Sequence, residues 1–171
     1  METKKYRTHP IYNNYGLDEN DDIVSVKTGR IRKYRPDKYG YNYITIRHDK
    51  KTYTLRLGIF KYECANGIVE EDKVIDHIDN NSSNDNLNNL QAITQSENIK
   101  KKYIGGYTNS THIRKIKGIN TVTGEEVIYR SMNGAGIVLN IVEASVRRVC
   151  EGQQFTAKSK IDGTKYKFEY I

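Results

Sequence analysis

The chain has 171 residues, with 28 Lys and Arg against 21 Asp and Glu and a formal net charge of +7. This length suits one domain or two or three small modules, and a hydrophobic content of 36 % argues against a single large core. No run approaches the ~20 apolar residues of a membrane span, the segment METKKYRTHP lacks the apolar stretch of a secretory signal, and two cysteines exclude a disulfide scaffold and a Cys-type zinc finger. The sequence therefore predicts an intracellular basic protein without membrane contact.

Basic residues are unevenly distributed along the chain. Residues 1–98 carry 15 basic and 15 acidic side chains, whereas residues 99–171 carry 13 and 6. Within the neutral half, residues 23–61 hold 11 basic and 2 acidic side chains, interleaved with Tyr. Such stretches are typical of a surface that binds a polyanion, because each neutralised phosphate releases a counterion; an ordinary solvated face is the alternative. The residues expected to contact DNA here are Arg30, Arg32, Lys33, Arg35, Arg47 and Arg56.

The first segment predicts β structure followed by a helix. From residue 22 to about residue 60, Tyr, Ile, Val and Thr alternate in short runs that are broken at 27–29 and 49–51. This pattern predicts short antiparallel strands joined by tight turns. Residues 58–66 then predict a short helix that ends near Gly67.

The middle segment, about 71–104, predicts a strand, a loop, a strand and a helix. The strand KVIDH leads into a polar loop in which six of the ten residues 80–89 are Asn. The second apolar run, LQAIT, is followed by a helix for which Thr94 is the expected N-cap and Glu97 the partner in a capping box. His9, His48 and His112 have no partners at ligand spacing, and we expect them to be solvent-exposed or part of the basic surface.

The last segment predicts two hairpins around a pair of short helices. Gly105-Gly106 indicates a linker, and residues 119–130 form the pattern of a hairpin that turns at Thr123-Gly124. Residues 131–139, capped by Ser131, and 142–150 then predict two helices around a turn near Asn140, which is helix-turn-helix spacing. Gly134 and Gly136 weaken the first helix by up to ~1 kcal/mol each relative to Ala. A closing hairpin turns at Asp162-Gly163.

The candidate chemistry lies in the middle segment. A strand pair packed on a helix would bring Asp76 beside Asn98, so that both supply oxygen ligands to a hard divalent cation such as Mg²⁺. His77 beside that ion can take a proton from an attacking water. Adjacent strand residues point to opposite faces, so Asp76 and His77 converge only where the strand is distorted or ends.

The segment DHIDNNSSNDNLNNLQAITQSENI resembles the HNH nuclease motif in the form found in phage and group I intron homing endonucleases. The resemblance rests on Asp76-His77, on Asn89-Leu90 and on Asn98 in the helix. It implies a ββα-metal fold with Asp76 and Asn98 as metal ligands, His77 as general base, and Asn89 as a structural residue that braces the loop and orients the histidine. The cofactor implied is Mg²⁺ or Mn²⁺, with no structural zinc.

The flanking segments resemble the same family and set the expected domain organisation. We expect an α+β, extended modular protein with a β-rich DNA-binding module at 1–67 and the ββα-metal unit at 68–104. A linker at 105–118 then leads to a helix-turn-helix module with flanking hairpins at 119–171. Further DNA contacts are expected from two groups: Lys100, Lys101 and Lys102 along the catalytic helix, and Ser145, Arg147 and Arg148 on the second helix of the pair. Arg147 and Arg148 can reach either a guanine edge or a phosphate.

The expected function is therefore that of a site-specific, homing-type DNA endonuclease. We expect a monomer that acts on double-stranded DNA in the cytoplasm of a bacteriophage-infected host and, with one motif per chain, nicks one strand. Two other functions remain open at this point. One is a non-catalytic DNA-binding regulator on a decayed HNH scaffold, and the other is a phage packaging or restriction-type nuclease with little sequence preference.

Overall fold

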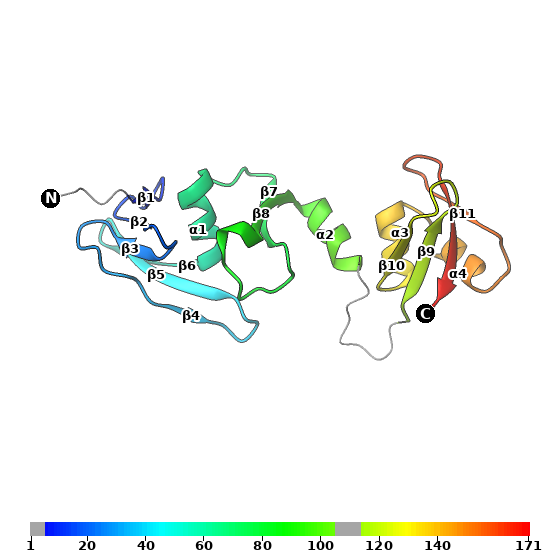
Figure 1. Cartoon of the computed structure of the whole chain (residues 1–171), viewed down its shortest axis with the longest axis horizontal. Coiled ribbons are helices and arrows are strands. Elements are labelled where there is room, and N and C mark those ends of the chain that lie inside the picture. Colours follow the sequence, from blue (N-terminus) through cyan, green and yellow to red (C-terminus); the bar gives the residue numbers. More distant parts are fainter. Residues whose placement is uncertain (1–5, 105–113) are drawn as a thin grey trace. The chain divides into compact units, whose positions relative to one another are not determined.

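The structure is a computed structural model that describes residues 6–104 and 114–171. The chain divides into two compact units, Met1–Gln95 and Ser96–Ile171, and each is described by itself (Figure 1). The fold is α+β, with antiparallel sheets and, in the described residues, four α-helices. None of these helices has the length and apolar character needed to cross a membrane. The predicted linker glycines Gly105 and Gly106 lie outside the described residues.

The first unit contains two small three-stranded sheets. One is formed by β1 (Arg7–Thr8), β2 (Tyr15–Leu17) and β3 (Ile23–Ser25), and the other by β4 (Tyr34–Pro36), β5 (Asn42–His48) and β6 (Lys51–Arg56). The predicted turn at 49–51 joins β5 to β6, and there both Asp49 and Lys50 adopt positive φ. The alternating pattern thus identified the second sheet, whereas β1 and β2 are too short to show any period.

Helix α1 (Leu57–Asn66) packs on these sheets and ends at Gly67, whose φ is 90°. The predicted helix and its glycine terminus are therefore confirmed. Its apolar side chains meet the inward residues of β2 and β5 in a core of Leu17, Ile44, Ile46, Leu57 and Phe60, all at most 2 % exposed. The buried thiol of Cys64 belongs to the same cluster.

The strand pair of the middle segment is part of the first unit. Strands β7 (Lys73–His77) and β8 (Leu90–Thr94) are antiparallel, and the loop between them contains the 3₁₀ turn η1 (Leu87–Asn89). Helix α1 contacts β7, β8 and η1. The boundary expected between residues 67 and 68 therefore does not separate two compact units.

His9 is buried, which corrects the expectation that it is solvent-exposed. Its side chain is 1 % exposed, and Nε2 lies 2.9 Å from Oε2 of Glu63. Nδ1 accepts hydrogen bonds from the backbone N–H groups of Ile11 (3.1 Å) and Tyr12 (3.2 Å). A neutral imidazole with its hydrogen on Nε2 satisfies all three contacts. The partner, Glu63, is 54 residues away in sequence, so no local pattern could reveal the pair. His48 is half-buried, and His112 lies outside the described residues.

Burial of His9 predicts a loss of stability in mild acid. Desolvation lowers the pKa of His9 from its ordinary value of 6.5. As the pH falls below that value, the unfolded chain takes up a proton that the folded unit does not, so the free energy of unfolding decreases until the folded pKa is passed. One such group contributes a slope of at most about 1.4 kcal/mol per pH unit. Urea unfolding between about pH 5 and 7 measures this slope.

The matched variant is His9→Asn, whose side-chain oxygen can still accept from the backbone but which does not titrate. It is expected to be less stable at neutral pH and to lose part of the wild-type slope. An unchanged slope in this variant would show that another group is responsible.

The second unit contains α2 (Gln95–Tyr103), apart from its first residue, and one four-stranded sheet. The sheet order is β10 (Glu126–Tyr129), β9 (Ile116–Asn120), β12 (Lys165–Tyr170) and β11 (Ala157–Lys158). Both predicted hairpins form, and the pairing of β12 with β9 joins them. The expected linker 105–118 is wrong at its end, because Ile116 is fully buried and pairs with Tyr129 and Tyr170.

Both helices expected in the last segment are present as α3 (Met132–Leu139) and α4 (Glu143–Cys150). The Ser131 hydroxyl accepts from the Gly134 N–H at 3.0 Å, as expected of an N-cap. The chain turns at Asn140 in the left-handed conformation, with φ 51°. Ala135 and Val146 of the two helices are fully buried in a core with Phe168 of the sheet.

Candidate active site

Asp76 and His77 are the last two residues of β7. Asp76 lies opposite Gln91 of β8, and the Gln91 amide donates to Oδ2 of Asp76 at 2.8 Å. His77 lies opposite Leu90 and ends the strand. Both residues therefore lie where the strand ends and its side chains stop alternating between faces. Such a position is required if Asp76 and His77 are to point to the same site.

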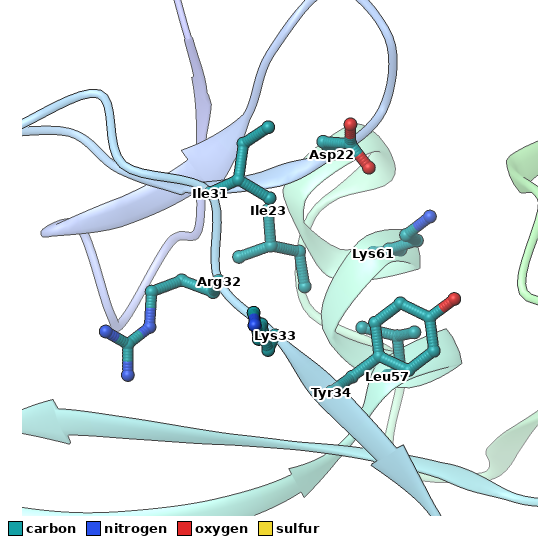
Figure 2. Close-up of a pocket in the computed structure, with 8 residues that line it drawn as sticks. All are labelled: Asp22, Ile23, Ile31, Arg32, Lys33, Tyr34, Leu57 and Lys61. Atoms are coloured by element: carbon teal, nitrogen blue, oxygen red, sulfur yellow. The ribbon is translucent and has the colours of Figure 1, made fainter.

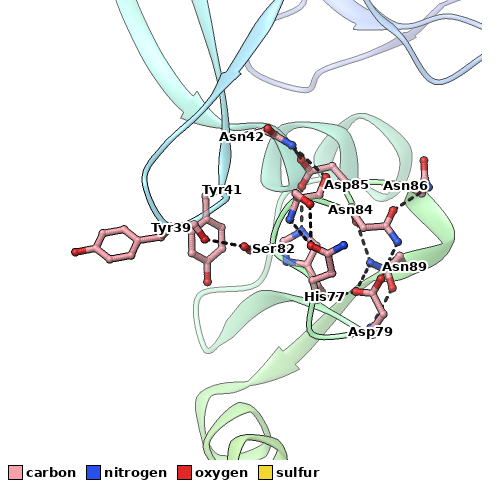
Figure 3. Close-up of polar contacts among 12 residues, drawn as sticks. Tyr39, Tyr41, Asn42, His77, Asp79, Ser82, Asn84, Asp85, Asn86 and Asn89 are labelled. Atoms are coloured by element: carbon pink, nitrogen blue, oxygen red, sulfur yellow. Dashed lines mark hydrogen bonds and ion pairs between the residues drawn. The ribbon is translucent and has the colours of Figure 1, made fainter. Parts of the chain in front are cut away.

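A buried carboxylate holds the imidazole of His77. Nε2 of His77 lies 3.0 Å from Oδ1 of Asp85, and the Asp85 side chain is only 6 % exposed (Figure 3). Oδ2 of Asp85 accepts from Nδ2 of Asn42 at 2.8 Å, and the same amide nitrogen donates to the Ser83 carbonyl at 3.2 Å. A buried carboxylate is tolerated where its oxygens are hydrogen-bonded, and both oxygens of Asp85 are.

The remainder of the loop is held together by its own side chains. Asn89 accepts from the Asp79 N–H at 3.1 Å and donates to Oδ1 of Asp79 and to the Asn84 carbonyl, both at 2.9 Å. Asn84 donates to Oδ2 of Asp79 at 2.8 Å, as Figure 3 shows. The bonds that its carboxylate accepts, from Asn84 first, then from the Asn81 N–H and from Asn89, lower the pKa of Asp79 to about 2. Asp79 thus serves as the acceptor at the centre of the loop.

The donor set expected for a metal is one carboxylate and one amide. Asp76 belongs to the first unit, whereas Asn98 lies near the start of α2 in the second unit and is half-buried. The described residues hold no group of three or more His, Cys, Asp and Glu side chains that could bind a metal ion. Oxygen donors of these two types, completed by water, fit Mg²⁺ or Mn²⁺. The pairing of Asp76 with Asn98 stays a prediction.

One face of the β4–β5–β6 sheet carries several of the predicted DNA contacts. The inward residues of β5 are Asn42, Ile44 and Ile46, so the intervening residues point to the opposite face. Residues that pair directly across strands share a face, which groups Arg35 and Arg56 with Tyr43, and Arg47 with Thr52. Arg35, Arg47 and Arg56 are all exposed there.

The other predicted contacts differ in exposure. Arg32 donates to the Thr45 carbonyl at 3.1 Å and lies 5.7 Å from the Tyr15 ring centroid, so its guanidinium is held within the unit. On α4, Arg147 donates to Glu143 at 2.8 Å. The exposed members of the remaining set are Arg30, Lys33, Lys102, Arg147 and Arg148, and the half-buried members are Lys100, Lys101 and Ser145.

A pocket of about 290 Å³ lies beside β4 and the start of α1 (Figure 2). Its wall combines the apolar side chains of Ile23, Ile31 and Leu57 with cationic side chains, among them Lys61, which the sequence did not single out.

The residues that the sequence missed at the candidate active site are Asp85 and Asn42. Asp85 lies within the motif segment but is not one of the residues on which the resemblance rests, and Asn42 lies in a strand outside that segment.

Comparison with known proteins shows what the chain is similar to. The family model described as HNH endonuclease matches residues 61–100. The chain is also 26 % identical to the DNA endonuclease I-HmuI of Bacillus phage SP01, over 87 % of this chain and 93 % of the phage protein. Residues 61–100 thus match the HNH endonuclease family, and most of the chain is similar to a phage homing endonuclease. The resemblance to HNH homing endonucleases that the motif predicted is thereby confirmed.

Two further comparisons concern a viral HNH endonuclease and a solved structure. The chain is 28 % identical to an uncharacterised HNH endonuclease of Acanthamoeba polyphaga mimivirus, over 93 % of this chain, and it spans about half (48 %) of that relative's length. The structure of the HNH homing endonuclease I-HmuI matches with a TM-score of 0.50 at 23 % identity and covers 98 % of both chains. This structural match shows that the fold is shared.

Proposed function

We propose that this HNH protein is a metal-dependent DNA endonuclease of the homing type in which His77 acts as general base. The observation that carries the proposal is the end of β7. There the family motif supplies Asp76 and His77 side by side, and the buried Asp85 carboxylate holds the histidine ring at 3.0 Å. A ring held in this way is suited to accept a proton in a fixed direction.

The reaction proposed is hydrolysis of a phosphodiester bond. His77 accepts a proton from a water molecule, the water oxygen forms a bond to phosphorus, and the bond from phosphorus to the 3′ oxygen breaks with the electron pair on that oxygen. Asp76 and Asn98 would hold a single Mg²⁺ or Mn²⁺, which supplies charge stabilisation for the phosphoryl and leaving oxygens. Asn89 keeps its proposed structural role, supported by its bonds to Asp79 and Asn84.

DNA recognition is proposed to involve both units. The exposed arginines of the β4–β5–β6 sheet would bind the phosphate backbone, and α4 would enter the major groove as the second helix of a helix-turn-helix. The exposed Arg147 and Arg148 support this role for α4. We further propose a monomer that binds double-stranded DNA site-specifically and nicks one strand in a bacteriophage-infected host, since each chain carries one motif.

Removing a sheet arginine is expected to weaken DNA binding and its salt dependence. Arg35→Ala or Arg47→Ala should each reduce the slope of log K against log salt by about 0.9 if the side chain neutralises one phosphate. Fluorescence anisotropy with a duplex, measured at several salt concentrations, gives the slope. Thr52→Ala changes an uncharged residue on the same face, and it should therefore leave the slope unchanged. Wild-type slopes in both arginine variants would exclude this face from the backbone contact.

The function itself is tested by cleavage of supercoiled DNA that carries candidate sites. The protein is incubated with Mg²⁺, with Mn²⁺ or with EDTA, and the products are separated on native and denaturing gels. Nicking at one position that requires the metal is the expected result. Linear product from a proven monomer would contradict single-strand nicking. DNA that is bound but never cut with either metal would instead favour the non-catalytic regulator.

A further inference from the structure

The position of the Asp85 carboxylate depends on residues outside the paired strands β7 and β8, namely the loop between them, strand β5 and helix α1. It lies in the loop eight residues after His77, its Oδ2 is bound by Asn42 of β5, and it is 7 % exposed. Gly58 of α1 lies against it, and a Cβ atom there would be 2.7 Å from Oδ1 of Asp85 and 3.6 Å from Nε2 of His77. The absence of a side chain at Gly58 therefore makes room for the contact between carboxylate and imidazole.

The bonds around Asp85 determine which atom donates in each contact. The Asn42 amide nitrogen is a donor only, and its second bond to the Ser83 carbonyl fixes its orientation, so Oδ2 of Asp85 must accept. An ionised carboxylate accepts at Oδ1 as well, which places the ring hydrogen of His77 on Nε2. In a neutral imidazole the basic lone pair is then on Nδ1, across the ring from Asp85.

We propose that Asp85 is a positioning residue for His77, which orients the imidazole and keeps its hydrogen on Nε2 so that Nδ1 is the atom that accepts the proton of the attacking water. This inference rests on the function proposed above. The arrangement follows the logic by which a carboxylate selects the tautomer of a catalytic histidine in other hydrolases. Asn42 and Gly58 belong to the β-rich segment that precedes the motif. This segment therefore also contributes to the orientation of His77.

The sharpest test is Asp85→Asn, because Asn42 dictates how the new amide must lie. Asn42 still donates, so the oxygen of the new side chain turns toward it and the NH₂ group faces Nε2 of His77. An acceptor is thereby replaced by a donor, and the hydrogen of His77 is expected to move to Nδ1. Long-range ¹H–¹⁵N spectra of the imidazole report this change directly, whether or not the protein is cutting DNA.

Cleavage kinetics are measured in parallel on the full-length protein. Loss of a partner that orients a metal-ligating histidine typically costs about 10–100-fold in activity. By analogy, kcat of Asp85→Asn should fall by at least about tenfold, with KM for DNA unchanged. Adding Asn42→Ala to this variant lets the amide rotate, and it should restore part of the wild-type tautomer and of kcat. Asn86→Ala, an exposed residue of the same loop, is the matched control and should behave as wild type.

The outcomes separate this inference from the proposed function. A wild-type spectrum with the hydrogen on Nδ1, or a wild-type kcat in folded Asp85→Asn, overturns the positioning role. If Asp85→Asn does not fold, two measurements still test the positioning role of Asp85: the tautomer of His77 in the wild-type protein and the kcat of Asn42→Ala. An unchanged kcat in Asn42→Ala counts against the positioning role. A wild-type protein that never cleaves DNA overturns the proposed function, and with it the catalytic use of this contact, even where the Nε2–H tautomer is found.

Discussion

His77→Ala is expected to abolish most of the DNA cleavage while leaving DNA binding intact. A positioned general base contributes about 10²–10⁴-fold to a rate, and the substitution removes the only group to which we assign this proton transfer. The imidazole lies at the end of β7 and is 12 % exposed, so its loss removes little of the exposed basic surface. Single-turnover cleavage with saturating protein measures the rate, and gel retardation without metal measures the affinity.

The control for His77→Ala is His48→Ala, which removes an imidazole at the end of β5 that pairs with Asp49. It should cleave at the wild-type rate. Cleavage by His77→Ala at the wild-type rate would rule out the general-base role. A parallel loss of affinity and cleavage would assign His77 to DNA binding.

Gly136→Ala is expected to destabilise the second unit, although helix propensity alone predicts the opposite. Alanine is favoured over glycine inside a helix by about 1 kcal/mol, and α3 contains Gly136 in its interior. However, a Cβ at this position would lie 2.6 Å from the carbonyl oxygen of Ile141, a backbone atom that cannot rotate away. Overpacking typically costs about 1–3 kcal/mol, so after the gain in helix propensity we expect a net loss of up to about 2 kcal/mol.

Thermal unfolding followed by circular dichroism measures the effect of Gly136→Ala. Asn133→Ala changes an exposed residue of the same helix and should stabilise it by a few tenths of a kcal/mol. The contact between Gly136 and Ile141 lies in the turn that leads into α4, so a shift of this turn would also displace α4. Gly136→Ala should therefore weaken DNA binding as well if α4 contacts the DNA. A Gly136→Ala variant more stable than wild type would mean that the turn shifts to accept the methyl group.

Local patterns predicted the elements that surround the candidate site. The strands β7 and β8 and the helix α1 were identified because apolar runs are bounded there by a polar loop and by Gly67, and these signals need only neighbouring residues. The same reasoning found α3, its cap Ser131 and the turn at Asn140. The HNH motif itself is local, which is why Asp76, His77 and Asn89 could be named from the sequence.

Features that depend on distant partners could not be predicted. The burial of His9 is decided by Glu63, and the pairing of β12 with β9 joins segments that are separated by two helices. Asp85 was missed for the same reason, because its role follows from Asn42, 43 residues away. Composition also misled at Gly136, where the cost of a helical glycine hides the close approach of Ile141.

The burial of Cys64 in the apolar core has a practical consequence for chemical labelling. Desolvation raises the pKa of this thiol to about 12, so it presents almost no thiolate to an electrophile in neutral solution. The second cysteine, Cys150, is only half-buried at the end of α4, although desolvation raises the pKa of its thiol as well. Since the sequence contains two cysteines, a maleimide fluorophore should attach first at Cys150. The unmodified protein therefore offers a preferred labelling position on α4, which would report in real time whether this helix docks on DNA as proposed.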